Sequence, residues 1–241
     1  MMASASGCLT PKKYPVNKPF VFKTNINIEG NLPAGERSDL ETRLQNQLDD
    51  SLRTRIVTII PFVRQLVKPP LFDSGSAAKS VQYMNNLLYS FGYYKATVSW
   101  DSSITEIQDQ KRVTVDFSVV PGKSYKFDSI AFALEDSVLQ SIALARASGT
   151  YLKKGDPYSV EIISLELDRI VDIFRNQGFY KFSKDDLEAQ RDTVFAALID
   201  PSLDPFERLQ LLQEAERRQE NPTMDVTIKL RDTSDASHRR K

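Results

Sequence analysis

The sequence predicts an α+β protein made of two tandem modules, each with the element order β-α-α-β-β. Three observations predict this class. The phrase VQYMNNLLYSFGYYK at 81–95 has a counterpart in LDRIVDIFRNQGFYK at 167–181. In both, apolar residues recur at steps of three and four, which is typical of a helix face, and then a Gly precedes two aromatics. Segments with strand-like alternation precede and follow each phrase. A repeated helix–Gly–strand unit indicates an array of small modules, which usually serves for binding.

The first half of the first module is expected to be a strand, a helix and an irregular connection. The module covers 20–122, after an irregular leader at 1–19. Apolar and polar residues alternate in FVFKTNINIEGN, which predicts a half-buried strand. A helix is expected at 36–55, because leucines recur every four residues (Leu40, Leu44, Leu48 and Leu52). Residues 56–73 contain three prolines and predict an elaborate connection.

The second half of this module is expected to be a helix and an antiparallel hairpin. The helix is capped by Ser74 or Ser76 and ends before Gly92, because glycine adopts the left-handed cap conformation without a Cβ clash. Alternation predicts a strand at 94–100. The polar loop DSSITEIQDQK then leads to a strand with Val113, Val115, Phe117 and Val119 on one face.

The second module, 123–232, is expected to repeat this order. It begins with a strand at 125–134, a helix at 135–148 and a long helix opened by Gly155-Asp156-Pro157-Tyr158. Phe179 to Phe182 are expected to begin the second strand, and the last strand lies at 223–232. Pro121-Gly122 is expected to be the turn between the modules.

The second module is expected to carry an insertion at 193–222. Within it, Asp204-Pro205-Phe206-Glu207 has the pattern of a helix start. That helix either packs on its own module or offers its apolar face to a partner. The tail at 233–241 is polar and is expected to be disordered.

Composition excludes several classes of function. Lys+Arg and Asp+Glu both number 32, and the zero net charge argues against a nucleic-acid binder. No apolar run approaches the roughly 20 residues that a membrane-spanning helix needs. The only His is His238 and the only Cys is Cys8, so a His- or Cys-based catalytic or metal site is not expected. No Gly-rich phosphate loop occurs, so no cofactor is expected.

Four aspartates and the single cysteine also have expected positions. Asp49, Asp50, Asp185 and Asp186 lie in charged stretches and are expected on solvated faces rather than in a catalytic pair. Ala5-Ser6-Gly7-Cys8 resembles the end of a bacterial lipoprotein signal, which makes Cys8 a candidate for lipidation. The alternative is a free cysteine in an irregular terminus.

The β-α-α-β-β order and the GYY and GFY phrases resemble the POTRA domain. These domains precede the membrane β-barrel in the BamA/TamA family of outer-membrane assembly proteins. The resemblance covers 20–232, and KPPLFD together with CLTPKKYP at 8–15 resembles a lipoprotein branch of the family. It implies a three-stranded mixed sheet in each module with two helices on one face. It also implies a scaffold at the periplasmic face of the outer membrane and not an enzyme.

The resemblance also implies where clients bind. In POTRA domains the second strand lies at a sheet edge, where unpaired N–H and C=O groups can accept an added strand. The candidate binding residues are Lys95, Ala96, Thr97, Val98 and Ser99, and Tyr180, Lys181 and Phe182. The implied partners are unfolded outer-membrane proteins and accessory assembly subunits.

Three versions of this function are open. No barrel follows within these 241 residues, so the chain is expected to be the periplasmic part of a longer protein or a stand-alone accessory protein. The leading version is barrel assembly. The alternatives are the POTRA pair of a two-partner secretion transporter, which exports one dedicated client, and a POTRA-type scaffold of the cell-division kind that recruits partner proteins.

Overall fold

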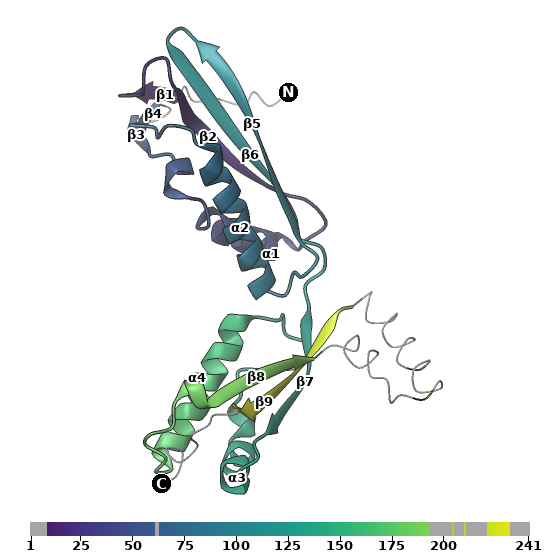
Figure 1. Ribbon diagram of the computed structural model, residues 1–241. Helices are drawn as coiled ribbons and strands as arrows, with labels where there is room; N and C mark the ends of the chain where they lie inside the picture. Colours follow the sequence, from purple (N-terminus) through teal and green to yellow (C-terminus); the bar gives the residue numbers. More distant parts are fainter. Residues whose placement is uncertain (1–8, 61–62, 193–203, 205–209, 211–220, 232–241) are drawn as a thin grey trace. The chain divides into compact units, whose positions relative to one another are not determined.

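The computed structural model describes residues 9–60, 63–192, 204, 210 and 221–231 (Figure 1). The chain divides into two compact units: the first comprises Met1–Tyr89 and Lys95–Gly122, and the second Ser90–Tyr94 and Lys123–Lys241. Among the described residues, each unit contains a three-stranded mixed sheet and two α-helices, as the sequence predicts.

The main sheet of the first unit has the strand order β2-β6-β5. Its strands are β2 (Pro19–Ile28), β5 (Thr97–Ile107) and β6 (Gln110–Val120), and β6 runs parallel to β2 and antiparallel to β5. Alternate residues of β6 are buried (Val113, Val115, Phe117 and Val119). Helices α1 (Ala34–Gln45) and α2 (Ser74–Ser90) cover one face of this sheet (Figure 1) and bury Leu40, Leu44, Met84 and Leu88. The alternation in the sequence therefore predicts the buried face correctly.

A second, smaller sheet in the first unit was not predicted. Strands β1 (Leu9–Lys12), β4 (Val63–Val67) and β3 (Ile56–Ile60) form it in the order β1-β4-β3. The expectation of an irregular leader is thus wrong for 9–12, and that of an irregular connection is wrong for β3 and β4. Strands of four or five residues carry too short a pattern to be recognised, and β1 pairs with residues more than 50 positions away.

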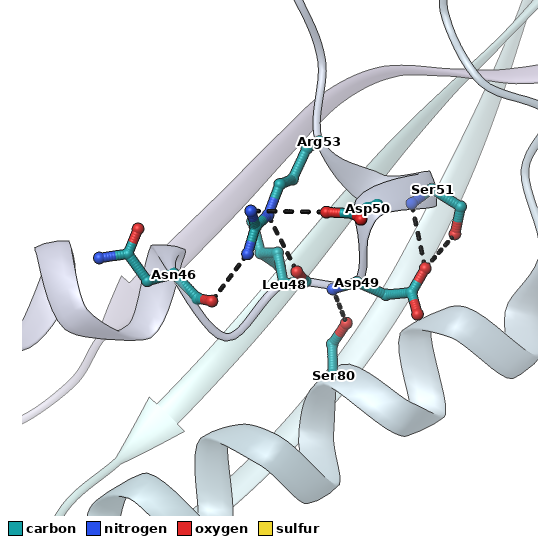
Figure 2. Close-up of polar contacts among 7 residues, drawn as sticks. All are labelled: Asn46, Leu48, Asp49, Asp50, Ser51, Arg53 and Ser80. Carbon is teal, nitrogen blue, oxygen red and sulfur yellow. Dashed lines mark hydrogen bonds and ion pairs between the residues drawn. The ribbon is translucent and has the colours of Figure 1, made fainter.

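The helix expected at 36–55 is also wrong in its extent, because α1 ends at Gln45. Figure 2 shows the reason. The Asp49 N–H donates to Ser80 Oγ of α2 at 2.9 Å instead of continuing the helix. The Arg53 guanidinium donates to the carbonyl oxygens of Asn46 at 2.7 Å and Leu48 at 3.0 Å. A contact between distant segments therefore ends the helix, and Leu52 reaches the core from a 3-10 turn at Asp50–Leu52.

Asp49 caps that turn through Ser51. Its carboxylate accepts from the Ser51 hydroxyl at 2.7 Å and from the Ser51 N–H at 3.0 Å (Figure 2). These hydrogen bonds hold the pKa of Asp49 below its ordinary value of 3.8, and the positive charge of Lys79 adds to the effect. Asp49 is half-buried, so the expectation of a fully solvated side chain holds for Asp50 but not for Asp49.

Asp49→Ala is expected to lower the free energy of unfolding of the first unit by about 0.5–2 kcal/mol at neutral pH, as for other lost caps. Because the folded-state pKa is lowered, the contribution of Asp49 is complete above 3.8 and is lost as the pH falls through the lowered pKa. The difference between wild type and variant should therefore shrink in acid. Urea unfolding followed by the fluorescence of Trp100, the only tryptophan, measures it.

Asp50→Ala is the matched control for this prediction. The Asp50 side chain is 96% exposed, and its ion pair with Arg53 spans 3.5 Å, so its loss should change stability by less than about 0.5 kcal/mol. Equal losses for the two variants would contradict the capping role of Asp49.

The β5–β6 hairpin is longer than expected. The segment 101–111, predicted as a polar loop, consists mostly of strand, and only Gln108 and Asp109 form the turn. Gln108 takes a positive φ of 57°, as two-residue hairpin turns require. Ser, Thr and Glu face solvent on this ribbon, so its polarity hides a strand of 11 residues.

The sheet of the second unit has the order β7-β9-β8. It consists of β7 (Lys126–Ala133), β8 (Leu187–Asp192) and β9 (Thr223–Leu230), and the helices are α3 (Ser137–Ala145) and α4 (Val160–Asn176). β9 runs parallel to β7 and antiparallel to β8. The buried core includes Phe127, Tyr158, Ile170, Phe174, Phe182 and Ile228. The first strand, both helices and the last strand lie where the sequence places them.

The second strand of this unit is the exception. Tyr180 and Lys181 lie in a turn, and the strand begins only at Leu187. Ser183 and Asp186 form a capping box around the intervening 3-10 turn. Asp186 is 1% exposed, which also overturns its expected place on a solvated face. The expected insertion at 193–222 and tail at 233–241 lie outside the described residues, apart from 204, 210, 221 and 222.

Candidate functional site

The free edges of the two main sheets are the candidate binding sites. In each sheet the central strand is paired on both sides, so only the outer strands can add a partner. The four outer strands are β2 and β5 in the first unit, and β7 and β8 in the second.

The outer edge of β2 is partly closed by its own unit. The Val21 N–H donates to the carbonyl oxygen of Pro70 at 2.9 Å, and the Phe72 N–H donates to that of Pro19 at 3.1 Å. At the other end of the strand, the Arg37 guanidinium donates to the carbonyl oxygens of Ile28 and Gly30. These bonds use backbone groups that an added strand would need.

β7 is closed in the same way. The Phe127 N–H donates to the carbonyl oxygen of Asp156 at 3.0 Å, and the Gly155 N–H donates to that of Phe127 at 2.7 Å. Gln140 of α3 then donates to the carbonyl oxygen of Phe132 at 2.7 Å. In both units the segment before the second helix covers the edge of the first strand.

The outer edge of β5 is open. Within the described residues, its 11 residues pair with no strand other than β6. The turn at Gln108 and Asp109 makes Ile107 and Gln110 a hydrogen-bonded pair, so the N–H and C=O groups of alternate residues point away from β6. These outward residues are Val98, Trp100, Ser102, Ile104 and Glu106. The Ser102 N–H agrees with this assignment, since it donates to the carboxylate of the preceding residue, Asp101, at 2.7 Å.

The outer edge of β8 is shorter and more charged. Of its six residues, Glu188, Arg191 and Asp192 are charged, and all three are exposed. Charged side chains on an edge strand oppose pairing with further strands. Arg191 also donates from Nη1 to the Tyr158 hydroxyl at 3.0 Å. β8 is therefore the weaker candidate of the two open edges.

A further open edge belongs to the small sheet. β3 pairs only with β4 among the described strands, and Ile56, Val57 and Ile59 are 42–54% exposed. The strand carries no charge. Sequence reasoning missed it, although IVTII is a run of β-branched residues that could have indicated a strand.

The structure separates the candidate residues predicted from the sequence. Thr97, Val98 and Ser99 lie on the open edge strand β5, whereas Lys95 lies in a turn and Ala96 just before the strand. Tyr180, Lys181 and Phe182 lie on no strand, and Phe182 is fully buried in the core. Their assignment to a working edge is therefore wrong. The expectation also missed the larger part of β5, residues 100–107.

Pro121, Gly122 and Cys8 are the other residues that the sequence singled out. Pro121 and Gly122 follow β6, and Gly122 has a positive φ of 73°. Cys8 lies outside the described residues. Among the residues with described positions, no three His, Cys, Asp or Glu side chains gather as a metal site would require, and no helix is long and apolar enough to cross a membrane.

Comparison with solved structures returns POTRA-containing proteins. The chain is similar to POTRA3-5 of BamA from Haemophilus influenzae, with a TM-score of 0.39 and 14% identity over 87% of this chain and 65% of that one. For BamA from Haemophilus ducreyi lacking POTRA domains 1-3, the TM-score is 0.41 and the identity 15%, over 89% of this chain and 29% of that one. For POTRA1-3 of Omp85 from Anabaena they are 0.36 and 10%, over 91% and 97%.

No protein-family model and no curated protein matches the chain. This chain spans less than two thirds of the length of both BamA chains. The description of the fold therefore rests on the strand orders β2-β6-β5 and β7-β9-β8 observed in the structure.

Proposed function

We propose that this chain is a POTRA region on the periplasmic side of the outer membrane, where it serves protein assembly or translocation. Its β5 edge would bind extended segments of unfolded outer-membrane proteins by strand addition. The observation that carries the proposal is the contrast between edges. The unit partly closes the edge of β2 with its own backbone, whereas no described segment pairs with the outer edge of the 11-residue strand β5.

Strand addition suits a scaffold that handles many clients. Main-chain hydrogen bonds bind any sequence, and each contributes about 0.5–1.5 kcal/mol net. The five outward residues of β5 offer enough bonds for a weak, reversible complex. Among the exposed side chains of β5, Thr97, Ser99, Ser103 and Thr105 are small and polar, and only Asp101 and Glu106 of its 11 residues are charged.

The test uses a synthetic peptide copied from a transmembrane strand of an outer-membrane protein. Ile104→Pro removes one outward N–H while leaving the bonds to β6, because proline is tolerated at the solvent side of an edge strand. It is expected to weaken peptide binding about 2–12-fold, which corresponds to one lost hydrogen bond. Fluorescence anisotropy of the labelled peptide measures the dissociation constant.

Ile104→Ala is the matched control, since it removes the same 55% exposed side chain and keeps the N–H. The two variants should both fold, as circular dichroism would show. Equal affinity of the Pro and Ala variants would contradict strand addition at β5. Photocrosslinking from Ser103 should capture the peptide; capture from Val57 alone would assign binding to β3 instead.

A further inference from the structure

The two copies of the helix–Gly–aromatic phrase share their local structure. α2 ends at Ser90 and α4 ends at Asn176. Two residues later each copy has a glycine with positive φ, 77° at Gly92 and 99° at Gly178. The next residue is buried in both copies, with Tyr93 6% exposed and Phe179 7% exposed. Up to this position the repeat is structurally equivalent.

The second aromatic of the phrase differs sharply between the copies. Tyr94 belongs to the second unit and packs against its core. Its ring lies 5.1 Å from that of Tyr125 and 5.9 Å from that of Tyr158. Its hydroxyl lies 4.0 Å from the sulfur of Met224. Tyr180 is 79% exposed, more than any other large apolar or aromatic side chain described.

The packing of Tyr94 depends on backbone features as well as on the ring. The Tyr125 N–H donates to the carbonyl oxygen of Gly92 at 3.1 Å. A Cβ on Gly92 would lie 3.1 Å from Tyr158, so only glycine allows this approach. Within the second unit, Gly92 and Tyr94 therefore occupy a specific seat. It is formed by the residue before β7, the segment before α4 and the start of β9, through Tyr125, Tyr158 and Met224.

We propose that residues 176–180 are a docking segment for a further β-α-α-β-β unit with a seat of this kind. Tyr180 would insert between the aromatic rings of that unit, as Tyr94 inserts in the second unit. A large aromatic side chain buries about 150–250 Å² when it packs, and leaving it in water at the end of a helix forgoes that contribution. The partner is recognised by its chemistry: two tyrosines and a methionine around a backbone N–H that faces the glycine carbonyl.

The register of the last strands shows how such a unit can be joined to the chain. Core-facing residues of β6 and β9 match in order, so that Val119 corresponds to Leu230 and Val120 to Arg231. Residue 121 of a second copy can therefore follow Arg231, as Pro121 follows Val120. An extended chain of residues 1–231 followed by a second copy of 121–241 supplies a seat whose composition is known. A Tyr180→Phe substitution in the added copy leaves the Tyr180 of the original chain as the only tyrosine at this position.

Nitration by tetranitromethane, followed by mass spectrometry of peptides, reports the accessibility of each tyrosine. In the original chain Tyr180 should react rapidly and Tyr94 slowly. In the extended chain Tyr180 should become as slow as Tyr94. Rapid nitration of Tyr180 in an extended chain whose added copy unfolds cooperatively would overturn the proposal and leave Tyr180 an ordinary exposed side chain.

A pair of substitutions adds a second measurement. In the original chain, Tyr180→Ala and Tyr180→Phe should unfold at the same urea concentration. In the extended chain, Tyr180→Ala should lower the unfolding midpoint of the added copy, and Tyr180→Phe should preserve it. No effect of Tyr180→Ala there would contradict docking. Peptide binding at β5 is a separate measurement, so the two proposals fail independently.

Discussion

Arg169→Ala is expected to lower the free energy of unfolding of the second unit by about 3–5 kcal/mol, the cost of removing one partner of a buried ion pair. Glu166 on α4 is fully buried. Its carboxylate accepts from Arg169 Nη2 at 2.6 Å and Nε at 2.9 Å, and from the Tyr151 N–H at 2.9 Å. Without Arg169 the carboxylate would remain buried with one backbone donor.

The physical reason lies in the cost of desolvation. A charge in the interior is tolerated only when its partner and hydrogen bonds compensate for lost water. Arg169 also donates from Nη1 to the carbonyl oxygen of Arg146 at 3.1 Å, so its removal leaves a second group without this donor. Hydrogen exchange of the β8 and β9 amides in increasing urea measures the stability of this unit.

Glu166→Gln in the Arg169→Ala background is the matched control. It removes the buried charge and keeps an oxygen that can accept from the Tyr151 N–H. The double variant should therefore be more stable than Arg169→Ala alone. If it were equally or less stable, the loss in Arg169→Ala would come from packing and not from an uncompensated charge.

Gly92→Ala is expected to cost about 2–5 kcal/mol in the second unit. About 1–2 kcal/mol comes from placing a Cβ in the left-handed conformation, since φ at Gly92 is 77°. A further 1–3 kcal/mol, roughly, comes from overpacking. The new Cβ would lie 3.1 Å from Cβ and Cδ1 of the buried Tyr158 and 3.3 Å from the backbone nitrogen of Tyr125.

Gly155→Ala separates the two contributions. Gly155 has a φ of 88°, and an added Cβ would meet nothing within 4 Å. It should therefore show the conformational cost alone, about 1–2 kcal/mol. The same hydrogen-exchange measurement compares the variants. Equal losses at Gly92 and Gly155 would contradict the close approach of Tyr158 to the Gly92 backbone.

Local patterns in the sequence predict the main elements well. Steps of three and four in α2 and α4 predict both helices, and alternation in β6 and β9 predicts the buried face of each sheet. The cap glycines Gly92 and Gly178 are predicted for the same reason, because a left-handed residue after a helix needs no information beyond its neighbours. These elements are encoded within about 20 residues of chain.

Predictions fail where distant contacts decide the outcome. The end of α1 depends on Ser80, 31 residues from Asp49. β1 is a strand because it pairs in parallel with β4. The second strand of the second unit begins after the Ser183–Asp186 capping box rather than at Phe179, because Phe182 is required in the core. None of these features is visible in the periodicity of the segment that adopts it.

The candidate site shows the same division. By itself, the sequence determined the α+β class, with mixed three-stranded sheets and amphipathic helices, since amphipathic periods and cap glycines act locally. It could not determine which edges stay open. The edges of β2 and β7 are closed by backbone bonds to Pro70 and Asp156, and β5 is open because nothing described pairs with it. Only tertiary structure decides this, because every residue except proline offers the same backbone donor and acceptor until a neighbouring segment uses them.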